Sequence, residues 1–116
     1  MIKLIMCLAR RSDLSREEFQ AYWKDDHGPF FMENAGIMRA KKYVQSHTIT
    51  SPLNDGMRQS RGMLEEFDGV AEVWFESREA MDAVFDTPEG QRARASATGT
   101  ASNIAILLTE EHLMVE

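Results

Sequence analysis

The chain has 116 residues, of which 43% are hydrophobic and 28% are charged, and this size and composition predict one globular domain spanning residues 1–116. Its formal net charge is −6, with the basic residues scattered along the sequence, so nucleic-acid binding is not expected. No run approaches the roughly 18 apolar residues of a membrane span, and the N-terminus lacks the order of a signal peptide, so we expect no membrane association and a cytoplasmic location.

The first predicted element is a strand over residues 2–9, IKLIMCLA, which is apolar at nearly every position. This segment holds the only cysteine, Cys7, so no internal disulfide can form. We expect Cys7 to be a small buried hydrophobe, with a reactive thiol as the alternative. A helix should then begin at Ser15, because Ser15 and Glu18 have the spacing of a capping box.

Aromatic residues follow in this helix at spacings of three and four, namely Phe19, Tyr22, Trp23 and then His27, which places them along one stripe. Pro29 has no amide proton, and its ring collides with the carbonyl four residues back, so the helix should end or kink just before it. His27 is therefore predicted to lie at an interruption of the helix, where its ring faces a cavity.

The next strand is predicted over residues 41–50, KKYVQSHTIT, with Tyr43, Gln45 and His47 on one face. Residues 51–67 contain a proline, an Asn-Asp-Gly run and a further glycine without a clear period. This pattern predicts a long loop.

A third strand is predicted over residues 69–76, GVAEVWFE, in which Glu72 and Trp74 share a face. Ser77 can cap a helix that runs to about Phe85.

A last helix is predicted to begin at Thr87-Pro88 and to end at Gly99. The last strand should begin with residues 104–108, IAILL, and run on to about Val115.

The order β-α-β-β-α-α-β predicts an α+β fold of the ferredoxin-like, split βαβ type, with a four-stranded antiparallel sheet and helices on one face. The first, third and fourth strands carry apolar residues on both faces, and exposed apolar patches of that size are rare on soluble monomers. We therefore predict a homodimer with two sheets face to face. The alternative is a monomer in which residues 51–67 fold over the sheet.

Three stretches of the sequence resemble the EthD family. They are the pattern F-x-x-Y-W-x-x-x-H-x-P at residues 19–29, the strand DGVAEVWFES at 68–77 and the ending TEEH at 109–112. The resemblance covers nearly the whole chain except residues 51–67, and it implies a dimeric α+β barrel.

Members of that family are similar to methylmuconolactone methylisomerase, to fungal polyketide decarboxylases and dehydratases, and to a protein associated with cytochrome P450 ether degradation. Relatives on the same fold include cofactorless monooxygenases and haem-degrading enzymes. The resemblance alone does not fix a reaction.

Two residues are candidate catalytic groups. His27 is the first, because imidazole titrates near neutral pH and because this motif histidine lines the pocket in relatives; its alternative role is to cap carbonyls at a helix end. Glu72 is the second, because a carboxylate in an apolar strand needs a partner or a raised pKa; its alternative role is an ion pair across the sheet with Lys3 or Lys41.

Four further residues are candidates for substrate binding: Tyr22, Trp23, His47 and Trp74. Aromatic stripes at helical spacing also serve as core, so Tyr22 and Trp23 have that alternative role. The three histidines are far apart, and no H-x-x-x-H, C-x-x-C or glycine-rich phosphate motif is present, so neither a metal nor a cofactor is expected.

The sequence thus predicts a protein that binds a small hydrophobic, oxygenated molecule of aromatic, polyketide or lactone-like type. We expect cofactor-independent proton transfer, as isomerisation, dehydration or decarboxylation, with His27 as acid or base. One alternative is a non-catalytic carrier or accessory protein of a cytochrome P450-type degradation pathway. Another is a cofactorless oxidoreductase or monooxygenase.

Overall fold

The computed structural model describes residues 1–62, 66–98 and 101–115. Along the chain the elements are β1 (Ile2–Arg10), α1 (Arg16–Tyr22), η1 (Trp23–His27), α2 (Gly28–Glu33), α3 (Ala35–Met38), β2 (Ala40–His47), α4 (Pro52–Arg61), β3 (Gly69–Phe75), α5 (Arg78–Phe85), α6 (Pro88–Thr98) and β4 (Ala101–Glu110). The predicted end of the last helix, Gly99, lies outside the described residues.

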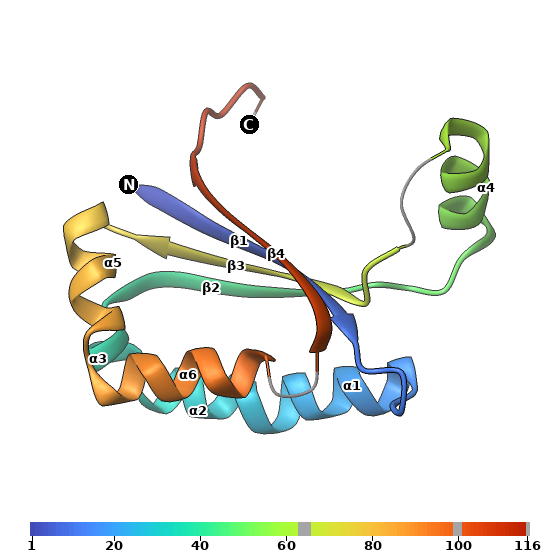
Figure 1. The fold of residues 1–116 in the computed structure, drawn as a ribbon. Coiled ribbons are helices and arrows are strands. Elements are labelled where there is room, and N and C mark those ends of the chain that lie inside the picture. Colours follow the sequence, from blue (N-terminus) through green and yellow to red (C-terminus); the bar gives the residue numbers. More distant parts are fainter. Residues whose placement is uncertain (63–65, 99–100, 116) are drawn as a thin grey trace.

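Within the described part of the chain the strands form one four-stranded sheet in the order β2-β3-β1-β4. Each neighbouring pair is antiparallel. The two long helical segments, α1 to α2 and α6, lie on one side of this sheet (Figure 1). The predicted α+β, ferredoxin-like fold is therefore confirmed.

The helix-facing side of the sheet carries the core. On β3 the side chains of Ala71, Val73 and Phe75 are buried, whereas the residues between them are half-buried. Around them lie two clusters of buried side chains, one made of Phe31, Met38, Val73, Phe75, Met81, Val84 and Ala93, and the other made of Leu8, Phe19, Trp23 and Ala71. The second cluster anchors the first helical segment to the middle of the sheet.

Local signals set the ends of several helices. The Oγ of Ser15 accepts a hydrogen bond from the Glu18 amide at 3.0 Å, and the Glu18 carboxylate accepts from the Ser15 amide at 2.9 Å. This is the predicted capping box. Ser77 likewise caps α5, since its Oγ accepts from the Ala80 amide at 3.1 Å.

The prediction of a long loop over residues 51–67 was wrong, because α4 occupies Pro52–Arg61. Ser51 caps this helix, and Gly62 ends it in the left-handed conformation that glycine adopts without strain. None of its residues is buried, and the helix stands apart from the other helices (Figure 1).

Two strands end earlier than the sequence predicted, because their partners end. His47 of β2 pairs with Gly69, the first residue of β3, so pairing does not reach residue 50. Glu110 of β4 pairs with Ile2, the first residue of β1, so the expected continuation to Val115 has no partner strand.

The side of the sheet that faces away from the helices has a charged end. Lys3 Nζ lies 2.8 Å from carboxylate oxygens of both Glu72 and Glu111, and Lys3 and Lys42 lie 4.9 and 4.8 Å from the centre of the Trp74 ring. The Trp74 indole N–H donates to Glu111 at 3.3 Å. The ion pair expected between Glu72 and Lys3 is therefore present.

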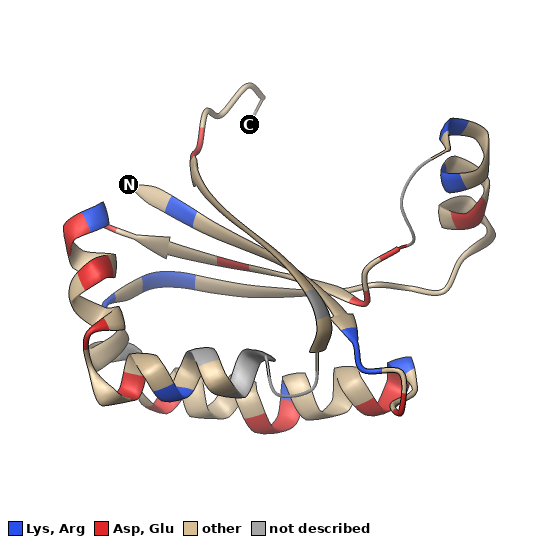
Figure 2. Cartoon of the chain, in the orientation of Figure 1, with Lys and Arg blue, Asp and Glu red and all other residues tan. Residues whose placement is uncertain are grey.

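The rest of this outer face is apolar. Ile5, Val44, Cys7 and Val70 are half-buried there, and Leu107 of β4 is 59% exposed. Figure 2 shows few charges along the strands and many on the helices. Cys7 is half-buried rather than fully buried, because its side chain lies on the face that no helix covers.

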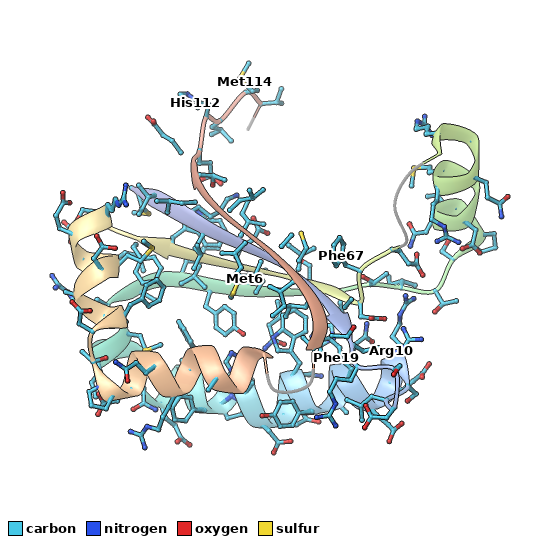
Figure 3. All side chains as sticks on the ribbon, in the orientation of Figure 1. Met6, Arg10, Phe19, Phe67, His112 and Met114 are labelled. Carbon is cyan, nitrogen blue, oxygen red and sulfur yellow. The ribbon has the colours of Figure 1, made fainter. Side chains whose placement is uncertain are left out.

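The chain beyond β4 leaves the sheet on the side away from the helices, where His112 and Met114 lie far from the helical layer (Figure 3). In the described residues we find no helix of the length and apolar character that crossing a bilayer would demand.

Candidate functional site

The helical segment that carries His27 contains a π turn. Residues Trp23–His27 form η1, in which the Gly28 amide donates to the Trp23 carbonyl, five residues back. In an α-helix the ring of Pro29 would collide with the carbonyl of Asp25, and the wider turn avoids this clash. The α-helix is thus interrupted where the sequence predicted, but it does not end there, because Gly28 and Pro29 open α2. Single π turns occur frequently at functional sites.

A side chain from the sheet binds this turn. Gln45 of β2 donates from Nε2 to the Trp23 carbonyl at 2.8 Å. A Cβ placed on Gly28 would lie 3.4 Å from the Gln45 Nε2 atom, which is about van der Waals contact. The turn and β2 therefore meet closely at Gly28.

Gln45 connects two more polar side chains of the same strand face. Its Nε2 lies 2.8 Å from the Tyr43 hydroxyl, and its Oε1 lies 3.0 Å from Nε2 of His47. An amide nitrogen only donates, and an amide oxygen only accepts. The Trp23 carbonyl can only accept, so the Gln45 atom that faces it must be the nitrogen, and this fixes the orientation of the Gln45 side chain. Hence His47 donates to Gln45, and Gln45 donates to Tyr43.

Aromatic rings surround this network. The Tyr43 ring packs against Phe31 with centroids 4.4 Å apart, and His27 meets Tyr43 edge to face at 6.4 Å. Trp23 packs against His47 at 4.8 Å. Trp23 is 2% exposed and His27 is 4% exposed, so both lie in the interior.

Burial sets the protonation states in this region. It lowers the pKa of His27, and together with the nearby Lys24 ammonium it lowers the pKa of His47. Burial raises the pKa of Tyr43, although hydrogen bonding from Gln45 and the nearby Trp23 indole opposes the rise. The two imidazoles and the phenol are therefore neutral at neutral pH.

A groove of about 410 Å³ adjoins the network, between the helical segment and the free edge of β2. Its walls include Lys24 and Gly28 of the helical segment, Phe31 and Met32 of α2, and Ala40, Lys41, Lys42, Tyr43 and Gln45 of β2. His27 is not one of these lining residues, but its neighbours Gly28 and Tyr43 are.

A second cavity, of about 400 Å³, lies where β1 ends and β3 begins, and its lining is charged. Asp68, which is 2% exposed, accepts from the Arg10 amide at 2.8 Å, from the Arg10 guanidinium at 2.9 Å and from Arg16 Nε at 2.8 Å. Burial would raise the pKa of Asp68, but these hydrogen bonds outweigh it and hold that pKa below its usual range. Arg16 also pairs with Glu66 at 2.7 Å.

The six site residues chosen from the sequence fall into separate groups. His27, Trp23 and His47 come together on the helix-facing side, next to Tyr43. Tyr22 is half-buried and belongs to neither core cluster. Glu72 and Trp74 lie on the outer face, with the sheet between them and His27.

Sequence reasoning did not select Tyr43, Gln45 or Asp68. The alternation of Tyr43, Gln45 and His47 placed the first two on the correct face, and a polar glutamine on a core-facing strand surface was the available signal. No signal of this kind marked Asp68, because its partners Arg10 and Arg16 are far away in the sequence.

Comparison with known proteins gives a family and a fold. The EthD domain matches residues 11–97 of the chain. No curated protein sequence matches significantly.

Three solved structures illustrate the likeness in fold. A protein of the ethyl tert-butyl ether d (EthD) family from Bacillus halodurans has 18% identity over 97% of this chain and 99% of that one, with a TM-score of 0.72. The hydroxynitrile lyase of Passiflora edulis has 14% identity over 99% and 96%, with a TM-score of 0.71. A dimeric protein of ferredoxin-like fold from Bacteroides fragilis has 15% identity over 95% of each chain, with a TM-score of 0.67.

Proposed function

Because the chain belongs to the EthD domain family, we propose that it binds a small hydrophobic, oxygenated molecule beside the π turn and catalyses cofactor-independent proton transfer with His27 as acid or base. The observation that carries the proposal is the placement of a buried, neutral imidazole in a π turn whose neighbours, Gly28 and Tyr43, line a groove. Perturbed titratable groups beside a cavity are common at reaction sites.

The proposed chemistry begins with the neutral imidazole. It removes a proton from a carbon next to a carbonyl group, the electron pair of that C–H bond becomes a C=C bond, and the carbonyl oxygen takes the negative charge. The imidazolium then returns the proton at another carbon, which isomerises the molecule, or to a departing hydroxyl group, which dehydrates it. The lowered pKa of His27 favours the first step, because the base is unprotonated at neutral pH.

The groove fits the proposed class of ligand. Phe31, Met32 and Ala40 supply apolar walls, and Tyr43 and Gln45 supply polar groups. Its volume of about 410 Å³ is typical of pockets that hold small organic molecules. We take the aromatic, polyketide and lactone-like molecules as the first substrates to test.

We also propose that the chain forms a homodimer through the outer face of the sheet. The apolar half of that face, with Leu107 59% exposed, supports this assembly, because burial of apolar surface stabilises an interface. A structural relative is described as dimeric, which adds support. In this arrangement Glu72 and Trp74 lie at the subunit interface.

The proton-transfer proposal is tested by following deuterium uptake from heavy water into enol lactones and aryl ketones by NMR. We expect His27→Gln to slow uptake at least about 100-fold, the usual contribution of a general base. His112→Gln is the matched control, because His112 is exposed beyond β4 and should leave the rate unchanged. Equal rates in wild type and His27→Gln would remove His27 from the mechanism.

A non-catalytic carrier is the second candidate function. It is favoured by the 4% exposure of His27 and by the absence of His27 from the groove lining. A carrier would bind the same molecules, catalyse no deuterium uptake and keep its affinity in His27→Gln. The same NMR experiment, combined with a binding titration, therefore separates the two functions.

A further inference from the structure

We propose that residues 49–61, which include helix α4, form an arm that packs against a second copy of this chain, beside the outer face of the sheet. The inference rests on the homodimer proposed above and goes beyond it by naming a second contact surface. It depends on the isolation of α4, on the placement of its apolar side chains and on the dimensions of the chain.

Helix α4 is too short to be stable through its own sequence. It has 10 residues, none of them buried, and they include the poor helix formers Asn54, Asp55 and Gly56. Isolated helices shorter than about 12–15 residues are only marginally stable in water, because most helical stability comes from packing an apolar side against other elements. The helix lies beyond the ends of β2 and β3, away from the helical layer (Figure 1). We therefore expect a further surface to cover α4.

The apolar side chains of the arm form one stripe. Ile49, Leu53 and Met57 recur at intervals of four residues, and they are 76%, 68% and 38% exposed. Arg58 follows about 100° round the helix from Met57. It faces its own chain, where it pairs with Glu66 at 3.8 Å and lines the charged cavity. The helix thus turns a charged side toward its own chain and leaves the apolar stripe uncovered.

The chain is also less compact than a monomer of its length. Its Cα radius of gyration is 15.1 Å, whereas a compact domain of 116 residues has about 13 Å. Helix α4 and the tail beyond β4 both project on the side of the sheet that faces away from the helices (Figure 1). The outer face lies between these two projections, so a copy seated on that face lies next to α4.

A second copy of the chain is the partner that fits this arrangement. Four strands of 7 to 10 residues give the outer face an outline of roughly 500 Å², whereas a stable interface buries about 800 Å² of each partner. Part of that outline is the ion-pair cluster of Lys3, Glu72 and Glu111, so the apolar contact from the sheet is smaller still. A two-fold dimer adds the contact of both arms, because each copy supplies one arm and receives another.

The test measures the dissociation constant of the dimer by sedimentation velocity, for wild type and for the double variant Leu53→Ser/Met57→Ser. We expect the double variant to raise this constant at least about 100-fold, because each copy loses two apolar side chains from the interface. Ile37→Ser is the matched control, since Ile37 is 47% exposed on α3, and it should change the constant less than about threefold. Equal constants in the double variant and the control would overturn the inference.

A measurement on the wild-type sequence guards against a variant that merely unfolds α4. When chains with ¹³C-labelled methionine methyl groups are mixed with unlabelled chains, isotope-filtered NOEs report only contacts between copies. We expect such NOEs at the methyl group of Met57, which Met57→Leu assigns among the eight methionines. Met38, which is 3% exposed in the core, is the internal control and should show none. A dimeric sample without these NOEs at Met57 would contradict the inference.

Failure of this inference is distinguishable from failure of the proposed function. A dimer that the double variant leaves unchanged would show that α4 is not an interface, whereas the dimer through the outer face would stand. A wild-type chain that remains a monomer at high micromolar concentration would overturn both the arm and the dimer. Deuterium uptake that depends on His27 is measured separately, and it decides the proton-transfer proposal in either case.

Discussion

Two polar regions of this molecule differ in the charge of the groups that they hold. Around Asp68, three donors from Arg10 and Arg16 converge on one carboxylate at 2.8 to 2.9 Å. Around Tyr43, the hydrogen-bonded groups are neutral, namely the phenol itself, the Gln45 amide and the His47 imidazole. The two regions should therefore respond differently to substitution and to pH, because one depends on paired charges and the other on neutral hydrogen bonds.

The Asp68 region holds four segments of the chain together. Its side chain binds the end of β1 and the start of α1, while its backbone carbonyl accepts from the Gln20 side chain at 3.0 Å and from the Thr48 amide at 3.1 Å. These contacts tie α1 and the end of β2 to the residue that precedes β3. We assign this region a structural role, despite the charged cavity beside it.

The largest expected effect is on this structural region. Asp68→Asn removes the charge that faces Arg10 and Arg16, and we expect it to lower the free energy of unfolding by about 3 kcal/mol, as for other broken buried ion pairs. Denaturant titration measures the change. Asp13→Asn is the control, because the ion pair of Asp13 with Arg11 is exposed and its loss should be undetectable. Equal stabilities of the two variants would show that the Asp68 bonds add little.

The second largest effect is expected in the hydrogen-bond network of Tyr43, Gln45 and His47. Gln45→Leu leaves the Trp23 carbonyl, the Tyr43 hydroxyl and His47 without their common partner, so we expect a loss of about 2 kcal/mol of unfolding free energy. Thermal or denaturant unfolding measures it. Gln91→Leu on the exposed side of α6 is the matched control, with no expected change. A Gln45→Leu protein as stable as wild type would mean that water replaces the amide there.

The dependence of stability on pH separates the two regions further. The pKa of His27 is lowered from 6.5 in the folded protein, so the unfolded chain takes up the proton first, and stability is complete above about pH 6.5 and falls as the pH drops below it. The loss of unfolding free energy amounts to about 1.4 kcal/mol for each unit by which the pKa of His27 differs between the folded and the unfolded chain. His47 acts in the same direction.

Asp68 acts in a different window, because its pKa is lowered from 3.8 and its contribution is lost only as the pH falls below that value. Unfolding free energies measured at neutral pH and near pH 5 therefore isolate the histidines. His27→Gln should flatten this part of the profile, and an unchanged slope in that variant would show that His27 is not the buried group that titrates.

The two regions also mark how far sequence reasoning reaches. The capping box at Ser15, the interruption of the helix before Pro29 and the pairing of Lys3 with Glu72 were predicted because each depends on local spacing or on strand alternation. Asp68 and Gln45 were not selected, because their partners come from distant segments that only the fold brings together. Helix α4 was read as a loop since its sequence contains Asn54, Asp55 and Gly56, which propensity alone assigns to turns.

The smallest expected effect is a change in the pKa of His47, caused by a lysine that lines the groove. The Lys24 ammonium lowers the pKa of His47, so Lys24→Glu should raise that pKa, as measured by NMR titration of the imidazole. Lys41→Glu is the matched control, because Lys41 also lines the groove but its ammonium lies 3.8 Å from Glu76 and has no such effect on His47. If both variants raised the pKa equally, the effect would come from the general field of the groove. A rise confined to Lys24→Glu would instead show that this residue of the π turn adds to the effect of burial in lowering the pKa of His47, which donates to Gln45.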